Sequence, residues 1–453
     1  MFIFKRVFSF FGLDQAIFFA TTANGISAIG NVVSIILILK NLSILEQGYY
    51  YTFLSIAAIQ SFFEMGLNGI IVQYVAYEKA QLHWQDQFRL FGNIKSLSRL
   101  KSLFLFFKKW YSIFGILLLL SLITVGYLFF TRYDNDNVQW FWPWVFLCSS
   151  VTVSFCLSPI LAFIQGLGLV KEATRIVLFQ TIFRLSTLWI FLFLDFKLYS
   201  LSISSLVASV FVLSLIFAKF KKIWFFISEI VVTEKINYKN EILPYQWRIA
   251  VSWISGFFIF QLFNPVLFVV EGPVIAGQMG MTLSVLNGIL SVSTAWISTR
   301  IPLFSTHIAN LNYQELDISF KRTLYQSTIV NIGCLLIFFF IVYFLRVSNF
   351  TYLGRAFSER FLDYFPLSLM MLTIVINHII ACFATYLRCH KRDPFFIYSF
   401  ITAVLNLLST LILGQQFGLL GLTVGYFLIV LISFPVLYAV YKKKKYEWHL
   451  TEI

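Results

Sequence analysis

Two ionisable residues lie near the middle of long apolar stretches, where a charge is costly. Glu64 is in IAAIQSFFEMGLNGIIVQYV, beside two glycines, and Arg184 is in IVLFQTIFRLSTLWIF. A charged side chain at the centre of a bilayer costs about 2.5–3.5 kcal/mol on insertion scales, so such residues usually face the protein interior or a water-filled cavity. Two interpretations are open: the two residues form a structural ion pair, or Glu64 binds a proton or cation while Arg184 faces an anionic substrate.

Three uncharged polar side chains are candidates to line a hydrophilic cavity in the N-terminal half. Asn24 and Asn31 lie seven residues apart in one apolar stretch, so they share a face if that stretch is a helix. Gln60 precedes Glu64 by four residues and lies on the same side of the helix. We expect these residues to contribute to substrate binding.

Three further residues are weaker candidates. Arg248 and Arg300 lie at the ends of apolar stretches, where membrane topology alone explains a cation, although a helix broken at Pro302 would turn Arg300 into the cavity. His378, in VINHIIACF, is a lone histidine in an apolar stretch. Packing is the simpler interpretation for His378, and a role in ion coupling is the alternative.

Motifs of soluble catalysis are missing from the sequence. It contains no GxxxxGK[ST], no GxSxG and no HExxH. Its five cysteines lie singly, without the spacing of a metal site or a disulfide framework. We therefore expect no enzyme activity, no metal site and no cofactor, apart from a coupling H⁺ or Na⁺. A membrane-embedded polysaccharide polymerase or glycosyltransferase remains an alternative.

Composition indicates that lipid is part of this protein's solvent. Hydrophobic residues make up 59% of the chain and charged residues only 12%, against about 25% charged in a typical globular domain. A spanning helix needs about 20 mostly apolar residues, and helices are expected because lipid offers no partner to unpaired backbone groups. Twelve such segments are predicted: 16–39, 49–74, 110–130, 142–164, 176–194, 200–218, 247–270, 274–297, 326–345, 366–387, 395–413 and 419–441.

The positive charges predict the orientation of these spans. With both termini on one side, 27 of the 34 lysines and arginines fall on that side and six on the other, and Arg184 lies within a span. Lysine and arginine are retained in cytoplasmic loops, so both termini are predicted to be cytoplasmic. The same bias explains the net charge of +14 without nucleic-acid binding. The basic N-terminus lacks a cleavage-site pattern, and we expect it to be retained as a short approach to the first span.

Two basic connections have the pattern of amphipathic helices that lie on a membrane surface. The first is KAQLHWQDQFRLFGNIKSLSRLKSLF and the second is KFKKIWFFISEIVVTEK. Their predicted apolar faces are Trp84, Phe88, Phe91 and Leu97 in the first connection, and Ile223, Ile227 and Ile230 in the second.

The two halves of the chain resemble each other weakly. ILEQGYYYTFLSI follows the first span and VIAGQMGMTLSV follows the seventh, each with a glycine opening the next helix. Parallel repeats about an axis normal to the membrane are typical of one class of transporter. We therefore predict an N-terminal lobe at 1–220, a cytoplasmic interfacial linker at 221–244 and a C-terminal lobe at 245–453.

Three stretches carry a resemblance to a known family. KNLSILEQGYYYTFLSI resembles the first loop and second helix of the polysaccharide exporters and O-antigen (Wzx-type) flippases, and FFEMGLNGIIVQYVAYEKAQLHW resembles one branch of them. VIAGQMGMTLSVLNGILSVSTAWISTRIPLFS is similar to their seventh-to-eighth region. The family belongs to the multidrug, oligosaccharidyl-lipid and polysaccharide (MOP) transporter superfamily. The resemblance covers most of the chain by layout and about a fifth of it by motif.

The resemblance implies an all-α polytopic membrane protein with two six-helix lobes around a central cavity, as in MATE transporters. It implies a flippase in a bacterial inner membrane that moves a polyprenyl-pyrophosphate-linked oligosaccharide to the outer leaflet by alternating access. The cargo would be a repeat unit of O-antigen, hence of lipopolysaccharide, or of another surface polysaccharide. Membrane lipids and a polysaccharide polymerase are the expected partners. A MATE-like drug antiporter is the alternative within the superfamily.

Overall fold

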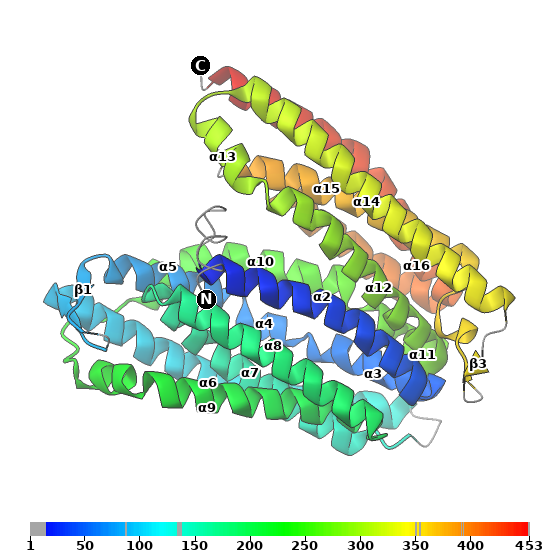
Figure 1. Ribbon diagram of the computed structural model, residues 1–453, viewed down its shortest axis with the longest axis horizontal. Helices are drawn as coiled ribbons and strands as arrows, with labels where there is room; N and C mark the ends of the chain where they lie inside the picture. Colours follow the sequence, from blue (N-terminus) through cyan, green and yellow to red (C-terminus); the bar gives the residue numbers. More distant parts are fainter. Residues whose placement is uncertain are drawn as a thin grey trace, which may run out of the picture. The chain divides into compact units, whose positions relative to one another are not determined.

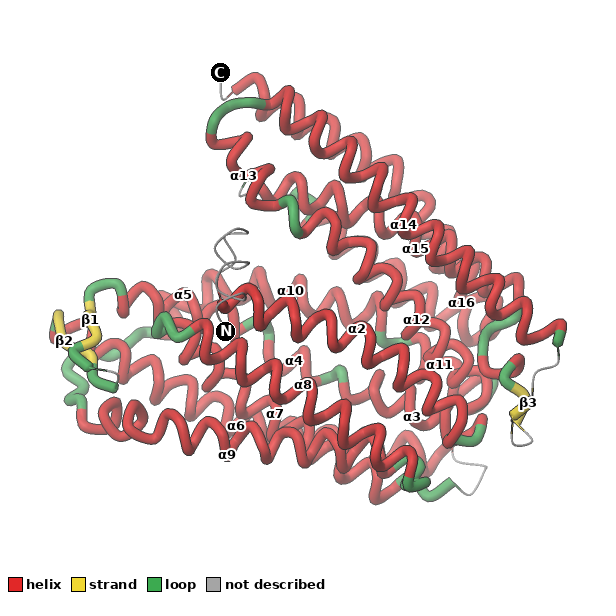
Figure 2. The backbone as a smooth tube through the Cα atoms, viewed as in Figure 1, coloured by secondary structure: helices red, strands yellow, loops and turns green. Residues whose placement is uncertain are grey.

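A computed structural model describes residues 15–86, 88–133, 138–348, 351–352, 355–390, 392 and 394–451. For some of these, including Asn24 and Arg248, only the backbone is described. The expectation for the extreme N-terminus concerns residues outside this set. Nearly all of the described backbone is helical, with strands only in two short antiparallel hairpins (Figure 2). The all-α polytopic fold expected from the sequence is confirmed.

The helices follow the predicted spans in order (Figure 1). The first part of the chain contains α2 (Gln15–Asn41), α3 (Ile44–Ala57), α4 (Gln60–Glu64), α5 (Leu67–Lys79), β1 (Leu82–Trp84), β2 (Leu90–Gly92), α6 (Ile94–Tyr133), α7 (Phe141–Gly166), α8 (Val170–Phe193) and α9 (Tyr199–Glu229).

The second part begins with a π-helical turn, η1 (Tyr238–Ile242). It continues with α10 (Leu243–Phe260), α11 (Phe263–Val270), α12 (Pro273–Ser298), α13 (Ile301–Ala309), α14 (Tyr313–Val347), β3 (Thr351–Tyr352), β4 (Arg355–Ala356), the 3₁₀ turn η2 (Ser358–Arg360), α15 (Tyr364–Cys389) and α16 (Phe396–Thr451).

Ten helical segments of the described chain are long and apolar enough to cross a membrane. One of them, α16, is two helices that meet at Gly418, whose φ of 57° and ψ of −136° are not helical. The carboxylate of Glu271 accepts a hydrogen bond from the Leu419 amide, which begins the second of these helices. Counting α16 twice and adding α2, whose apolar part is shorter, gives twelve crossings. This number agrees with the sequence prediction.

The chain forms two compact units. Unit 1 contains the residues up to Asn41 and Ile56–Ile254, and unit 2 contains Leu42–Ser55 and the residues from Ser255 onward. The second predicted span is therefore shared, because most of α3 packs in unit 2 while α4 and α5 pack in unit 1. The lobes and linker expected at 1–220, 221–244 and 245–453 stay a prediction.

Within each unit, neighbouring helices bury small and apolar side chains against each other. In unit 1, α2 packs along α8 (Figure 1), α7 packs on α5, α6 and α9, and α8 packs on α9. In unit 2, α12 packs on α11, α14 and α15, and α16 packs on α11 and α15. Many large apolar side chains remain exposed on these helices, as a lipid-facing surface requires.

The first amphipathic connection is not the surface helix expected from the sequence. Strands β1 and β2 pair as an antiparallel hairpin, with His83 opposite Phe91. Asp86 stabilises its turn, because the carboxylate accepts hydrogen bonds from the amides of Phe88 (2.7 Å) and Arg89 (2.8 Å). These two bonds lower the pKa of Asp86. An Asx-type turn competes with helix at this point, and the helix begins only at Ile94.

The second amphipathic connection is partly an extension of the sixth span. α9 continues to Glu229, and Ile223 and Ile227 are both buried within the protein. The predicted apolar face therefore exists but packs against other helices. Phe104 of α6 stacks on Trp224 beside it, with ring centroids 5.3 Å apart.

Candidate functional site

The second span is broken next to Glu64. α4 ends at Glu64, Met65 and Gly66 both adopt left-handed conformations (φ 46° and 68°), and α5 begins at Leu67. A left-handed conformation is costly for a residue with a side chain but not for glycine. Helix ends are where backbone groups lose their intrahelical partners, and Glu64 is the last residue of α4.

Neutral partners surround the Glu64 carboxylate. The amide of Asn68 donates a hydrogen bond to Glu64 Oε1, and the Gln60 side chain also hydrogen-bonds this carboxylate. Tyr111 of α6 donates to Asn68 Oδ1 over 3.2 Å, which fixes the orientation of the Asn68 amide. Glu64, Gln60 and Asn68 are all partly exposed. The sequence prediction that Gln60 and Glu64 share a side of the span agrees with this arrangement.

An aromatic residue of α10 lies directly on the break. A β-carbon added to Gly66 would lie 2.2 Å from Ile249 Cγ2 and 3.0 Å from Trp253 Nε1, so α10 approaches the bare backbone there. Position 66 therefore requires glycine for two reasons: the left-handed backbone conformation, and the lack of room for a side chain beside α10. Trp253 is 48% exposed and lies against Gly66, two residues after Glu64.

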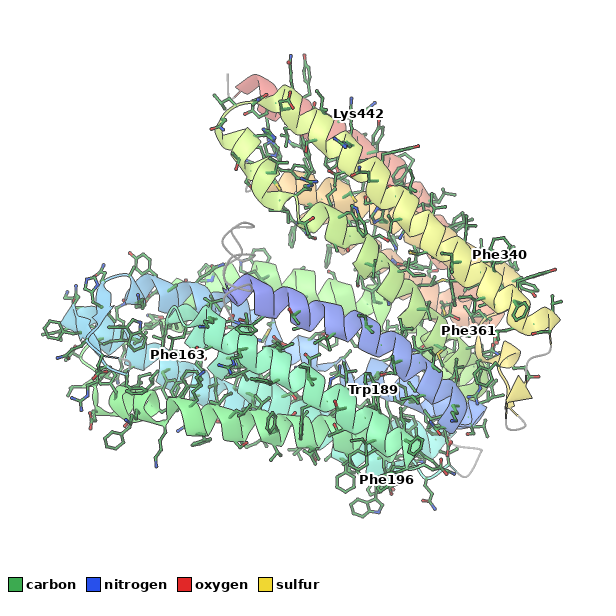
Figure 3. All side chains as sticks on the ribbon, in the orientation of Figure 1. Phe163, Trp189, Phe196, Phe340, Phe361 and Lys442 are labelled. Carbon is green, nitrogen blue, oxygen red and sulfur yellow. The ribbon has the colours of Figure 1, made fainter. Side chains whose placement is uncertain are left out.

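Arg184 lies on α8, where that helix packs closely on α2. A β-carbon on Gly30 would meet the Leu185 side chain at 2.4 Å, and Trp189, labelled in Figure 3, donates to Ser34 Oγ over 2.9 Å. Arg184 itself is half-buried, and its guanidinium makes no hydrogen bond or ion pair with the described residues. Asn31 follows Gly30 and is exposed, and Arg184 precedes Leu185, so both polar residues are next to a close contact between the two helices.

Glu64 and Arg184 do not pair with each other in the described part of the chain. The carboxylate has amide partners instead, and the guanidinium is left with its five donors available. Of the two interpretations that the sequence left open, the structural ion pair is therefore wrong for this conformation.

Two of the remaining candidates are described by their backbone alone. The backbones of Asn24 and Arg248 lie on α2 and α10, and their side chains are outside the description. Arg300 is exposed at the residue preceding α13. Its assignment to substrate binding, like that of the other candidates, stays a prediction.

His378 is fully buried in unit 2. Its Nε2 lies 3.1 Å from Ser327 Oγ on α14, and Cys382 Sγ lies 3.7 Å from the same nitrogen. The Ser327 hydroxyl also donates to the Leu324 carbonyl over 3.0 Å. The contact between His378 and Ser327 holds the ring between α14 and α15 and accounts for its burial by packing.

Unit 2 also buries an arginine that the sequence analysis did not single out. Arg360 is 1% exposed, and it donates to Gln47 Oε1 (3.0 Å) and to the Leu42 carbonyl (2.7 Å). Gln47 in turn donates to the Gly277 carbonyl over 2.9 Å. These contacts attach the start of α3 to α12 and to the loop before α15. Nothing in the local sequence distinguishes Arg360 from its neighbours, because its burial depends on three distant segments.

At the end of unit 1 predicted to be cytoplasmic, Arg99 joins two carboxylates. It donates to Glu78 Oε1 (2.7 Å) and to Glu241 Oε2 (2.6 Å), and Tyr74 donates to the Glu241 carbonyl over 2.5 Å. Burial acts to raise the pKa of Glu241, but hydrogen bonds from Arg99 and from the Asn237 amide outweigh it and hold the pKa below its ordinary value of 4.5. This cluster fixes the chain just before α10.

Metal binding finds no support in the described residues, which contain no group of three histidine, cysteine, aspartate or glutamate side chains able to hold an ion. The arrangement instead offers an unpaired guanidinium, a carboxylate held by amides, and an exposed indole, all in unit 1.

Several solved structures share this fold. A MATE-family multidrug resistance transporter of the MOP superfamily, in an inward-facing conformation, is 13% identical with a TM-score of 0.57, over 94% of this chain and all of that one. The lipid II flippase MurJ is 15% identical with a TM-score of 0.56, over 96% of this chain and 90% of that one. The MATE multidrug transporter DinF-BH, solved with R6G, is 14% identical with a TM-score of 0.55, over 94% of each chain.

No protein-family model and no curated protein matches the chain. The solved structures show that the chain has the fold of the MOP superfamily transporters. Its long apolar helices make it a multi-pass membrane protein. The three structures are those of transporters and a flippase rather than of enzymes. At identities of this size the likeness establishes the fold, and the substrate has to be argued from the residues.

Proposed function

We propose that the chain is a flippase for a polyprenyl-pyrophosphate-linked oligosaccharide, the repeat unit of O-antigen or of another surface polysaccharide. The observation that carries the proposal is Arg184, a half-buried guanidinium near mid-span without a partner among the described residues. An arginine is retained at such a depth when it faces a polar compartment. The planar guanidinium donates two parallel hydrogen bonds, which suits the oxygens of a pyrophosphate.

The setting of the proposal is a bacterial inner membrane with both termini in the cytoplasm. The charge bias of 27 to six supports this orientation. Substrate would enter from the inner leaflet with its lipid tail between helices and its head group inside the protein. A lipid-linked substrate is supported by the fold shared with the lipid II flippase, and a polysaccharide polymerase is the expected partner downstream.

Glu64 is our candidate for coupling to H⁺ or Na⁺. It lies at a helix break, and in transporters the backbone carbonyls of a broken helix together with a carboxylate suit a coupling cation. Its hydrogen bonds come from neutral amides, so protonation or cation binding would not have to displace an arginine or lysine.

A small-molecule antiporter is the second candidate, because two of the structures that share the fold are multidrug transporters. An acidic binding site would favour cationic drugs, and the unpaired charge of Arg184 opposes them. Cells that express the chain should therefore retain R6G as control cells do. Export of R6G that depends on Glu64 would favour the antiporter.

The decisive experiment deletes the gene and locates the lipid-linked intermediates. Accumulation of complete repeat units on the cytoplasmic leaflet, reversed by the wild-type chain, is expected for a flippase. Units that have crossed the membrane but are not polymerised would instead identify a polymerase, and normal surface glycan would remove the proposal.

A further inference from the structure

We propose that the broken second span and α10 form a saccharide-contact site, in which the Trp253 indole stacks on a sugar ring and Glu64 and Gln60 bind its hydroxyl groups. The inference rests on the proposed function, because it gives the glycan part of that substrate a place in unit 1. It assigns a role to Trp253 that the sequence did not suggest.

The position of Trp253 is fixed by the backbone break. Gly66 has no side chain, and the pyrrole edge of Trp253 lies close to the position where a β-carbon would stand, 3.0 Å from Nε1 and 3.1 Å from Cδ1. Ile249, one turn earlier on α10, covers the same glycine. Trp253 therefore lies against Gly66, which is two residues along the chain from Glu64, in a place set by packing.

The Trp253 indole is accessible for contact with a ligand. Trp253 is 48% exposed, and its N–H makes no hydrogen bond with the described residues. A tryptophan on a membrane helix can also face lipid, but an ionisable carboxylate beside it would then face hydrocarbon too. The cost of that placement favours a shared polar compartment.

The chemistry of the group suits a neutral, polyhydroxylated ring. The face of an indole carries partial negative charge, and the C–H groups on one face of a sugar ring are apolar and weakly positive. A carboxylate accepts hydrogen bonds from hydroxyl groups, while a glutamine amide and an indole N–H donate to them. The site therefore offers stacking, acceptors and donors within a few residues.

The Glu64 carboxylate in this site disfavours binding of the pyrophosphate. Two negative charges a few ångströms apart repel strongly in a medium of low dielectric constant, so an ionised Glu64 excludes the anionic part of the substrate. That part is left to Arg184, which the structure does not pair with Glu64. Asn68 is a positioning residue, because its amide bonds Glu64 and its carbonyl is held by Tyr111.

The test compares two lipids on the purified full-length protein in nanodiscs. One is the lipid-linked oligosaccharide extracted from cells that lack the chain, and the other is undecaprenyl pyrophosphate without sugar. The ratio of their dissociation constants measures the sugar contribution. We expect the wild type to prefer the glycosylated lipid by roughly three- to tenfold, the range of one aromatic contact.

The variants then locate this preference. Trp253→Ala should abolish it while leaving the affinity for undecaprenyl pyrophosphate unchanged, and Trp253→Phe should keep part of it. Arg184→Ala should weaken the binding of both lipids by the same factor. Trp247→Ala is the matched control, since Trp247 is 51% exposed on the same helix but lies on another face. Size-exclusion profiles in detergent check that each variant is folded, and Trp253→Phe carries the test if Trp253→Ala is not.

Two results would overturn the inference. One is a wild type that binds both lipids equally, and the other is an unchanged preference in the Trp253 variants. Either leaves the flippase proposal standing, because pyrophosphate binding persists. If neither lipid binds better than a phosphatidylglycerol control, the proposed function itself fails.

Discussion

Glu64 and Arg184 carry opposite charges in the same unit, yet their surroundings differ. The carboxylate is held by Asn68 and Gln60, whereas the guanidinium has no partner among the described residues. A charge held by neutral amides can be titrated or bind a cation without breaking an ion pair. A guanidinium with unused donors can bind an anion directly.

Removal of the Arg184 charge should weaken substrate binding. We expect Arg184→Ala to lower surface glycan and to reduce affinity for the lipid-linked oligosaccharide by roughly ten- to a hundredfold, the range of one lost hydrogen bond to a charged group. Arg184→Lys should recover only part of the loss, because lysine lacks the bidentate geometry. Normal glycan in cells with folded Arg184→Ala would remove this residue from the mechanism.

Removal of the Glu64 charge should affect transport and not binding of the pyrophosphate. We expect Glu64→Gln to reduce surface glycan while the protein stays folded, since glutamine keeps the size of the side chain but cannot carry the coupling ion. Flux in proteoliposomes with and without a proton or sodium gradient measures this. A Glu64→Gln variant that still responds to the gradient would contradict the coupling role.

Glycines determine how individual helices run and pack. At Gly66 the requirement is both the left-handed backbone and the contact with α10. At Gly277 it is space alone, because a β-carbon there would lie 2.8 Å from the backbone nitrogen of Gly48 on α3. Small residues in membrane helices let backbones approach in this way.

Alanine at the break should destabilise unit 1. Gly66→Ala forces a left-handed backbone on a residue with a side chain and pushes it into Ile249 Cγ2, at a cost of about 1–3 kcal/mol. Gly69→Ala is the matched control, since Gly69 lies in the helical part of α5 with open space around its β-carbon position. The melting temperature in detergent should fall for the first variant only. Equal melting temperatures of the two variants would show that the helix break does not require glycine at position 66.

Replacement of Gly277 by alanine should weaken the packing of α12 on α3 in unit 2. Gly277→Ala overpacks the contact with Gly48, at roughly 1–3 kcal/mol. Gly288→Ala on the same helix has nothing within 4 Å of its β-carbon position and serves as control. Faster hydrogen exchange of α3 amides in Gly277→Ala, compared with Gly288→Ala, is the expected measurement. Identical exchange in both variants would argue against this packing.

For the whole molecule, the connection between α9 and α10 is anchored to unit 1 along the start of α6. Ser98 Oγ accepts hydrogen bonds from the amides of Thr233 (2.7 Å) and Glu234 (2.8 Å), and Ser102 Oγ accepts from Ile236 (3.0 Å). The Arg99 cluster follows. The chain therefore passes from one unit to the other within α10, after Ile254, and not in the polar connection that precedes it.

This anchoring should depend on pH through Glu241. Because its pKa is lower in the folded protein than the ordinary 4.5, its contribution is full above about pH 4.5 and is lost as the pH falls through the folded-state value. The melting temperature in detergent should thus fall on acidification, and Glu241→Gln should lose roughly 0.2–1 kcal/mol of stability at pH 7 but little at low pH. Glu229→Gln, at an exposed carboxylate on α9, should show no such difference. If the melting temperatures of the wild type and Glu241→Gln differ by the same amount at both pH values, ionised Glu241 does not anchor this connection.

Much of this fold is determined by the sequence itself. The apolar segments and the lysine and arginine bias depend only on local composition, so twelve crossings and an all-α fold follow without tertiary information. Glu64, Arg184 and Gln60 stand out for the same reason, as polar residues at a depth where each must be explained. The resemblance to the O-antigen flippases led to the superfamily whose fold the chain has.

Only the tertiary structure decided which residues meet. Asn68, held by Tyr111, donates to Glu64; Trp253 covers Gly66; and Arg360 binds Gln47. In each case the contact joins helices that are far apart in the sequence or turned by a backbone break. The β1–β2 hairpin stands where the periodic pattern predicts a helix, and its turn has two backbone hydrogen bonds to Asp86 that compete with helix. Hydrophobicity is a property of each residue and can be summed along the chain. Hydrogen-bond partners depend on how whole helices pack, which no local pattern contains.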